Sequence, residues 1–510
     1  MIIIYHKSER VTNLENLEAS DGFVGLPLLD CVLKLAKDFP EEILAWCRED
    51  YKTQFNSREI PDFFTHHQLL FSYHIGEDSF LNNSIGYVED SNFIKVNKSV
   101  RYSTWQMSSD VGAAHASVLN RIPNPDRSDS FSYLLNSFAK KAAPQGLFCY
   151  SEPALLTGTV SPAHKSEQTN SDTVFKFVRQ HYRSTWIFIL LFNLLIYEKR
   201  FPIGAFFKSL FLKKRKLDAH FSPHLLNEPD FQDLPTVDVI IPTIGRKIYL
   251  YDFLKDLAKQ TILPANVIII EQNANPEAVS ELDYLVSEQW PFKIKHTLSH
   301  QPGACRARNL ALEQRSSEYI FLADDDIRID ANCIEEIIKK MTALQAHAVT
   351  VNCRQAKDEQ MYVNIFQSSF FGSGCSMVKS AAIGDSRFSM AYEFGFGEDN
   401  DFGMQLRNKG YDIIYLPNPT ILHIKAPVGG FRIKMVFPWN SDSVAPKPSP
   451  TVMLFYLKYY TKQQLAGYKT ILFFKYYSLQ STKNPIRYYR NFTKRWDKSI
   501  VWANHLNNVK

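Results

Sequence analysis

The sequence predicts an α/β protein whose central domain, residues 236–430, is built on a mostly parallel sheet. From residue 236 onward, short β-branched runs alternate with segments whose apolar residues have helical spacing. Polar and acidic residues follow directly after these runs, as expected where parallel strands end at one edge of a sheet. The chain has 510 residues, so further domains are expected on either side.

The elements of the central domain follow from these periodicities. The predicted strands are 237–241, 267–270, 292–298 and 319–322. The predicted helices are 250–257, 279–286 and 304–314. Strand and helix therefore alternate with short connections, which predicts helices on both faces of the sheet.

Three further regions flank this domain. Residues 1–165 predict an α/β or α+β domain of unknown role, in which the apolar clusters 31–36 and 43–46 favour helices. Residues 166–235 form a linker, with an exposed polar stretch at 157–173 across its start. Residues 431–510 predict a helical extension rich in basic and aromatic residues.

The linker contains two apolar pieces, 186–197 and 201–212, and the second is followed by four consecutive bases. Each piece is too short to span a bilayer, which needs about 18 apolar residues or more. Apolar helices flanked by bases suit a membrane interface, and a buried core helix is the alternative.

Charge is distributed unevenly. The chain carries a net charge of +5, yet residues 451–510 carry +10 and residues 179–216 carry +8, which leaves −13 for the rest. The two basic segments therefore predict an anionic partner. Because 14 aromatic residues are interleaved with bases in 451–510, a membrane surface is favoured. Nucleic acid is not expected as a partner, since no recognisable nucleic-acid module accompanies the bases.

Polar residues at the predicted strand ends are candidates for ligand binding. Pro242 and Thr243 follow the first strand, and Glu271 follows the second. Arg306 and Arg308 lie in the helix 304–314, whose positive N-terminal end suits phosphate. Each of these features alone is weak, because polar residues end most strands and a basic helix can simply be solvated.

Three adjacent acids, Asp324, Asp325 and Asp326, follow the fourth strand. Their mutual repulsion predicts a divalent cation, which is bound by carboxylates together with substrate phosphates. A solvated acidic turn is the alternative. Asp399 lies in a second acidic cluster and can act as a general base or as a helix cap. His423 ends a later apolar run and is a further candidate ligand.

The order of these features resembles family 2 glycosyltransferases with the GT-A (Rossmann-like) fold, over residues 236–427. The shared landmarks are Val-Ile-Ile-Pro at 239–242, a Gly-x-x-x-Ala-Arg-Asn-like segment at 303–309, the aspartate triplet, Gly-Glu-Asp at 397–399 and His423. The resemblance implies that Asp324 and Asp326 hold a donor diphosphate through Mn²⁺ or Mg²⁺. It also implies that Asp399 deprotonates the acceptor and that Thr243, Glu271 and Arg308 lie near the nucleotide.

The resemblance implies a metal-dependent, inverting glycosyltransferase of the bacterial cell-surface polysaccharide type. Its donor would be a UDP-, GDP- or dTDP-sugar, and its acceptor a glycan or a lipid-linked molecule. The expected location is cytoplasmic, peripheral at the inner face of the cell membrane, in agreement with seven scattered cysteines that lack paired spacing.

Two rival functions are weighed against this one. A nucleotidyltransferase that makes nucleotide sugars shares a similar sheet, but its glycine-rich, lysine-containing signature is missing after the first strand. A catalytically degenerate sugar-binding partner is disfavoured by the intact acids. The chain departs from the family pattern at two places, Ala323 before the triplet and Glu271-Gln272 after the second strand. These departures affect the predicted nucleotide and metal contacts rather than the predicted class of enzyme.

Overall fold

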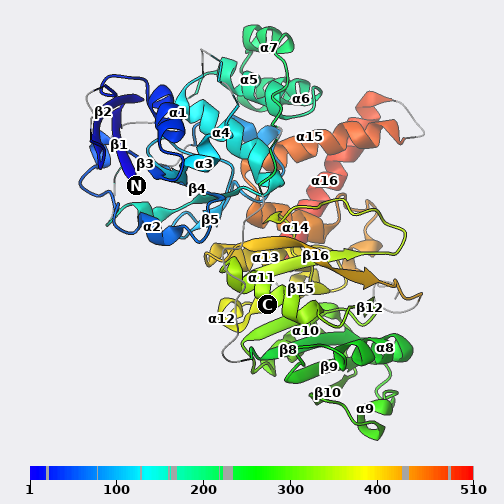
Figure 1. Cartoon of the computed structure of the whole chain (residues 1–510). Helices are drawn as coiled ribbons and strands as arrows, with labels where there is room; N and C mark the ends of the chain where they lie inside the picture. The colour runs from blue at the N-terminus through cyan, green and yellow to red at the C-terminus, as the bar shows by residue number, and fades with distance from the viewer. Residues whose placement is uncertain are drawn as a thin grey trace. The chain divides into compact units, whose positions relative to one another are not determined.

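The computed structural model divides into two compact units (Figure 1). The first comprises residues 1–224, 364–367 and 460–480, and the second comprises 225–363, 368–459 and 481–510. The structure describes all residues except 19–21, 77–78, 124, 127–128, 159–160, 162–168, 218, 222–233, 428–435, 481–483 and 509–510. Parts of three predicted segments thus lie outside the described residues: the polar stretch 157–173, the linker 166–235 near its end, and the extension at its start, residue 431.

A mixed seven-stranded sheet forms the centre of the first unit, in the order β2-β1-β3-β6-β4-β7-β5. Its strands are β1 (Ile2–Lys7), β2 (Arg10–Glu15), β3 (Ile43–Arg48), β4 (Leu69–Tyr73), β5 (Tyr102–Ser103), β6 (Val111–His115) and β7 (Phe148–Ser151). The predicted helix at 43–46 is wrong, because this run is β3, in which Leu44, Ala45 and Trp46 are fully buried. A short apolar run in the interior has no periodicity that distinguishes strand from helix.

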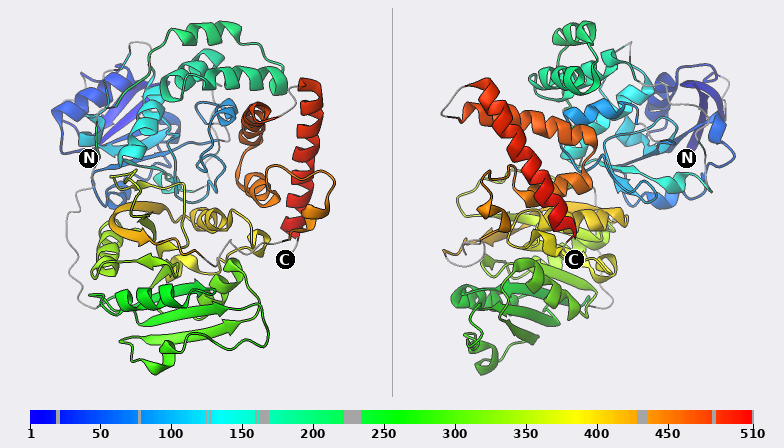
Figure 2. Two further views of the ribbon diagram at one scale, coloured as in Figure 1. Left: turned by 90° about the vertical axis from the view of Figure 1, so that its right-hand side faces the viewer. Right: turned by 180° about the vertical axis from the view of Figure 1, so that it is seen from behind.

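Helices pack around this sheet and extend the core of the first unit. The larger ones are α1 (Leu28–Asp38), α4 (Phe131–Ala142), α5 (Ser171–His181), α6 (Trp186–Asn193), α7 (Ile203–Leu210) and α15 (Lys462–Ser478). A π-helical turn, Leu194–Glu198, follows α6. Helix α15 lies beside α6 although the two are far apart in sequence (Figure 2). None of the described helices is long and apolar enough to cross a membrane.

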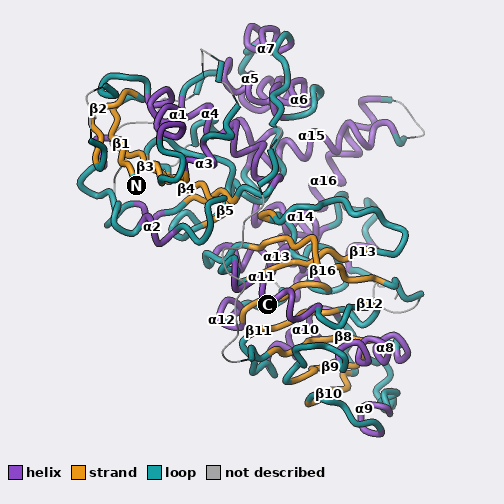
Figure 3. The backbone as a smooth tube through the Cα atoms, in the orientation of Figure 1, coloured by secondary structure: helices purple, strands orange, loops and turns teal. Residues whose placement is uncertain are grey.

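The second unit is built on a mixed sheet (Figure 3). Its strands run in the order β10-β9-β8-β11-β15-β13-β16-β12. They are β8 (Val237–Thr243), β9 (Asn266–Gln272), β10 (Lys293–Ser299), β11 (Tyr319–Ala323), β12 (Ile327–Arg328), β13 (Ala348–Arg354), β15 (Cys375–Lys379) and β16 (Ile413–His423), while the short strand β14 (Phe366–Gln367) falls among the residues of the first unit. β8 to β11 pair in parallel. These four strands confirm the predicted strands and the α/β class.

The helices of the second unit agree with the prediction in two cases and differ in one. They include α8 (Lys247–Leu257), α10 (Ala304–Glu313), α11 (Cys333–Ala343), α13 (Glu398–Asn408), α14 (Pro450–Tyr459) and α16 (Pro485–Asn508). The predicted helix 279–286 is wrong, since only the turn α9 (Tyr284–Ser287) is helical. Val279 and Val286 are exposed, and the preceding chain is held instead by Ser280 and the Glu281 N–H, both of which donate to the Glu271 carboxylate.

The C-terminal region is helical, as predicted, and two of its helices belong to the second unit. The buried carboxylate of Asp401 on α13 accepts hydrogen bonds from Lys458 (2.8 Å) and Tyr459 (2.9 Å) on α14. Helix α16 packs against α14. It buries Tyr488, Phe492 and Trp496, so this part of the aromatic extension forms a core.

Candidate active site

A cleft of about 630 Å³ opens at the sheet edge where β8, β9, β11 and β16 end. Ligands in open α/β sheets bind at this edge because the strand ends and the following loops converge there. Of the residues predicted from the sequence, those that line the cleft are Pro242, Arg308, Asp324, Asp325, Asp326, Asp399 and His423. Side chains from five separate segments therefore meet in one place.

Asp325 is a buried member of the aspartate triplet. Its carboxylate accepts hydrogen bonds from Thr243 Oγ1 (2.7 Å) at the end of β8 and from Arg246 Nη1 (2.6 Å) at the start of α8. Burial raises the pKa of Asp325 to about 6, although these two partners act in the opposite direction. Thr243 itself is buried and positions Asp325 rather than lining the cleft.

Asp326 is paired with the end of β16. Ile327 on β12 is in register with His423, which brings His423 Nε2 to 3.5 Å from Asp326 Oδ1. The N–H of Ala426 donates to Oδ2 at 2.9 Å. Burial alone would raise the pKa of Asp326, but the hydrogen bonds from His423 and Ala426 and the charge of Arg246 outweigh it and hold the pKa low. The same contact raises the pKa of His423.

Asp324 is connected to helix α10 by Arg308, whose Nη2 lies 3.1 Å from Asp324 Oδ1. The Arg308 side chain is buried, while that of Asp324 is 39% exposed to the cleft. Gly374 packs directly against this carboxylate, because a Cβ at that position would lie 2.2 Å from Asp324 Oδ2. A residue with a side chain at 374 would therefore displace Asp324.

Asp399 is the second residue of α13 and accepts a hydrogen bond from the Ser373 hydroxyl. Burial raises its pKa, and the nearby charge of Arg308 and the Ser373 hydrogen bond limit the increase. The neighbouring Glu398 also lines the cleft, and burial together with the charge of Asp399 raises its pKa to about 7. Glu398 can therefore accept a proton near neutral pH.

Other predicted residues lie outside the cleft lining. The Glu271 carboxylate is occupied by Ser280, Glu281 and His296 Nε2 (2.9 Å), and its neighbour Gln272 lines the cleft instead. Arg306 is exposed on α10 and does not line the cleft.

Four functional candidates were missed from the sequence, namely Arg246, Ser373, Glu393 and Lys425. Glu393 takes the two N–H groups at the start of α10 where phosphate was predicted, at 3.1 Å from Cys305 N and 2.9 Å from Arg306 N. Gly303 permits this approach, since a Cβ there would lie 2.5 Å from the Glu393 carboxylate. Apart from the position of Arg246 just after a strand end, the sequence carried no signal for them.

Asp324, Asp326 and His423 are the residues of the cleft that could hold a divalent ion. Within the described ranges, no group of three His, Cys, Asp or Glu side chains converges tightly enough to hold a metal alone. Asp326 and His423 are nevertheless adjacent, and Asp324 is partly exposed in the same cleft. An oxygen and nitrogen donor set of this kind fits a Mn²⁺ or Mg²⁺ that is also bound by substrate phosphates.

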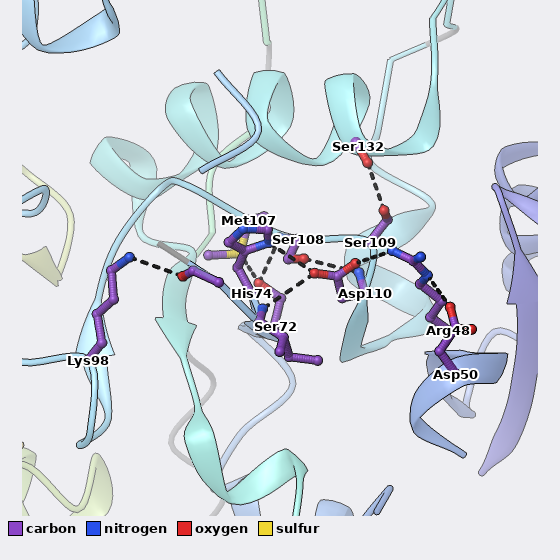
Figure 4. A network of polar contacts seen from close by, with 12 residues as sticks. Arg48, Asp50, Ser72, His74, Lys98, Met107, Ser108, Ser109, Asp110 and Ser132 are labelled. Carbon is purple, nitrogen blue, oxygen red and sulfur yellow. Dashed lines mark hydrogen bonds and ion pairs between the residues drawn. The ribbon is translucent and has the colours of Figure 1, made fainter. Parts of the chain in front are cut away.

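The first unit contains a separate polar network at the ends of β3 and β4 and the start of β6 (Figure 4). Asp110 lies between His74 Nδ1 (2.9 Å) and Arg48 Nη1 (3.6 Å), and Arg48 also binds Asp50. Burial alone would raise the pKa of Asp110, but these partners and the Ile75 N–H hold it low. This arrangement ties three strands together and satisfies a buried charge.

The sheet and the acidic cleft define the second unit as the catalytic domain of a glycosyltransferase with the GT-A fold. Residues 238–372, about a quarter of the chain, match the family model described as glycosyl transferase family 2. The protein is therefore a glycosyltransferase, and this region of the second unit is similar to family 2, as the sequence resemblance predicted.

Relatives of known name agree with this assignment. The chain is 24% identical over 233 residues to the GalNAc(5)-diNAcBac-PP-undecaprenol beta-1,3-glucosyltransferase of Campylobacter jejuni, covering 44% of this chain and 72% of that protein. It is 22% identical over 116 residues to the glycosyltransferase GlyG of Streptococcus pneumoniae, covering 23% of this chain and 38% of the relative. The chain thus spans less than half of the length of GlyG.

Two solved structures share part of the chain at low similarity. S. aureus TarS 1-349 in complex with UDP-GlcNAc has a TM-score of 0.33 and 17% identity, over 40% of this chain and 63% of that chain. GalNAc-T7 with UDP, GalNAc and Mn²⁺ has a TM-score of 0.34 and 13% identity, over 44% of this chain and 50% of that chain. At these scores the assignment depends on the family model and on the sheet of the second unit.

Proposed function

We propose that this protein is a metal-dependent, inverting glycosyltransferase that moves a sugar from a nucleotide-diphosphate donor to a glycan or lipid-linked acceptor in cell-surface polysaccharide synthesis. One observation carries the proposal. The aspartate triplet and Asp399 line the same cleft, and the buried Arg308 lies between them, bound to Asp324 and electrostatically coupled to Asp399.

The triplet forms the donor side of the proposed site. Asp324 and Asp326, with His423, would hold Mn²⁺ or Mg²⁺, which when bound would neutralise the charge of the leaving diphosphate. Asp325 does not need to bind metal in this arrangement, because Thr243 and Arg246 already occupy its two oxygens. Arg246 also lies 3.2 Å from Asp326 Oδ2 and fixes the spacing of the two carboxylates. Pro242 and Gln272 line the wall on which the nucleoside would pack.

Asp399 is proposed as the base on the acceptor side. In a single displacement, the acceptor oxygen forms a bond to the anomeric carbon while the bond from that carbon to the diphosphate oxygen breaks, and the acceptor proton passes to Asp399. Burial raises the pKa of Asp399, which makes its carboxylate a stronger proton acceptor than an exposed aspartate. The Ser373 hydroxyl donates to the same carboxylate and orients it.

The nature of the acceptor and the location are proposed from the relatives and from charge. The Campylobacter relative is named for a polyprenol-linked glycan acceptor, and a lipid-linked acceptor would place this transferase at the inner face of the cell membrane. The basic segments 179–216 and 451–510 favour an anionic surface over a neutral one.

A donor screen tests the catalytic proposal. UDP-, GDP- and dTDP-sugars are offered with Mn²⁺ or Mg²⁺ to the wild type, Asp326→Ala, Asp399→Asn and the control Asp252→Asn, which lies on α8 outside the cleft lining. We expect one nucleotide class to be turned over only with metal, by the wild type and the control. If no nucleotide class is either bound or turned over, the proposal is overturned. If the protein instead releases pyrophosphate from a nucleoside triphosphate and a sugar phosphate, the nucleotidyltransferase alternative is favoured.

A further inference from the structure

Helices α6, α7 and α15 of the first unit, with the π-helical turn between α6 and α7, carry a concentration of exposed apolar side chains that we term the apolar helical surface. Among the described residues, eight phenylalanines are exposed, and six of them lie on these elements or directly beside them: Phe188, Phe192, Phe201, Phe207, Phe211 and Phe474. Phe211 is 86% exposed and Phe201 is 70% exposed. Scattered exposed apolar residues are normal, whereas a contiguous group marks a contact surface.

Contacts between aromatic rings connect α7 to α6 and α6 to α15. Phe207 contacts Phe206, whose ring centroid lies 5.2 Å from that of Phe188 on α6. Phe188 and Phe192 are four residues apart and therefore share a side of the helix. Phe192 in turn lies 5.4 Å from Phe474 on α15. The surface is thus continuous although its parts are more than 250 residues apart in sequence.

A groove of about 740 Å³ follows this surface between α6 and α15. Apolar side chains, including Leu195 and Ile471, form most of its lining, and Arg183 and Lys475 are its charged members. A groove of this chemistry suits hydrocarbon between its walls and an anionic group near its bases.

The charge around the surface is strongly positive. Between residues 183 and 214 there are six Lys or Arg and a single acid, Glu198, which binds Arg200. Lys199, Lys213 and Lys214 are exposed beside the phenylalanines. A second copy of the chain would bring two such clusters together, and like charges repel across an interface. An anionic partner that also accepts apolar side chains is therefore required.

We propose that the apolar helical surface docks the protein on an anionic phospholipid bilayer, with the phenylalanines at the acyl boundary and the bases at the lipid phosphates. The inference rests on the proposed membrane location and not on the proposed catalytic chemistry. It also divides the basic C-terminal region, because α15 contributes Phe474 and Lys475 to the surface while α16 buries Tyr488, Phe492 and Trp496 inside the second unit. Helix α16 is therefore not expected to insert.

Vesicle flotation of the full chain tests whether the apolar helical surface binds an anionic bilayer. Vesicles of phosphatidylcholine, with or without phosphatidylglycerol, are mixed with the wild type or with a triple variant, Phe188→Ser, Phe207→Ser and Phe211→Ser. The control triple variant, Val279→Ser, Val286→Ser and Met361→Ser, removes strongly exposed apolar side chains from the second unit. We expect binding of the wild type and the control to anionic vesicles, and a loss of at least about tenfold in the Phe variant, because the inserted apolar area is removed. Replacing Lys199, Lys213 and Lys214 with Gln should abolish the preference for phosphatidylglycerol.

The outcomes separate the two proposals. Asp326→Ala should lose turnover but float like the wild type, and the Phe variant should keep donor turnover with a short soluble acceptor. A wild type that does not float, or a Phe variant that floats equally well, would overturn the docking surface. Self-association of the wild type that the Phe variant abolishes, without flotation of either, would instead identify a contact between copies.

Discussion

Thr470 donates a hydrogen bond of 2.7 Å to the side chain of Asn193, and both residues are buried. Asn193 also donates to the Ile189 carbonyl within α6. An amide in the middle of an apolar helix is costly unless its polar atoms have partners. The contact therefore explains why the apolar segment 186–197 contains an asparagine and why α15 packs beside α6.

Replacing Thr470 with Val should destabilise the first unit by about 1–3 kcal/mol, because the buried Asn193 oxygen loses its donor. Thr470→Ser keeps the hydroxyl and serves as the matched control. Urea unfolding followed by fluorescence should give a lower midpoint for the Val variant alone. Equal midpoints for the two variants would show that this hydrogen bond does not fix α15 to α6.

Asp399→Asn should lower kcat by about 10²- to 10⁴-fold while leaving donor affinity nearly unchanged, since the variant removes only the proton acceptor. Calorimetric donor binding and steady-state kinetics separate these effects. A fall in donor affinity as large as the fall in kcat would contradict the assignment of Asp399 as the base.

Ser373→Ala should move the acidic limb of the kcat/KM profile to higher pH. The Ser373 hydrogen bond lowers the pKa of Asp399, so its removal raises that pKa and more base is protonated at a given pH. At a pH well above the limb, the loss of rate should be small. A uniform loss at every pH would indicate that Ser373 only supports the fold of the site.

His423→Ala should weaken Mn²⁺ binding at least about tenfold, because the imidazole beside Asp326 is the proposed nitrogen ligand. His300→Ala, at an exposed position outside the cleft lining, is the control. Binding is measured as the increase of the melting temperature on titration of Mn²⁺ into protein that has been treated with EDTA. If the two variants titrate alike, His423 does not bind the ion.

Without metal or donor, the free energy of unfolding should fall as the pH rises from about 4 to about 6, through the titration of Asp325. Burial raises the pKa of Asp325 from 3.8 to about 6 in the folded chain. Protonated Asp325 therefore favours folding below pH 4, and this contribution is lost as the pH rises through the folded value. This difference between the pKa values of Asp325 in the unfolded and folded chain corresponds to about 3 kcal/mol in the free energy of unfolding.

Urea titrations between pH 4 and pH 7 compare the wild type with Asp325→Asn and with the exposed control Glu277→Gln. The difference between the wild type and Asp325→Asn should change through this window, and the control should follow the wild type. Parallel profiles for all three proteins would mean that Asp325 titrates as an ordinary aspartate.

Local sequence patterns were sufficient to predict the strands β8 to β11 and the position of the aspartate triplet. Alternation and β-branching are properties of a few consecutive residues, and the carboxyl ends of parallel strands meet at one edge whatever the loops do. The resemblance to family 2 glycosyltransferases, rather than these local patterns, placed Asp399 and His423 with Asp326. All three line the cleft.

Contacts between distant segments could not be predicted in this way. Arg246 binds Asp325 across 79 residues, and Glu393 reaches the start of α10 from 87 residues away. Glu271 turns out to be occupied by Ser280 and His296. Each of these pairings depends on how loops cross the sheet edge, and loop paths leave no periodic signal in the sequence.

The sequence by itself determined the class of the protein, the parallel strands β8 to β11 and the set of acids proposed for its chemistry. Only the tertiary structure decided how the three aspartates differ, because burial beside Thr243 and Arg246 raises the pKa of Asp325 while His423 and the Ala426 N–H lower that of Asp326. The sequence also contained the apolar and basic segments, but only the folded chain joins Phe192 to Phe474 and buries the aromatic residues of α16. The physical reason is that desolvation and packing depend on neighbours in space, and adjacent residues of the same type can meet very different surroundings.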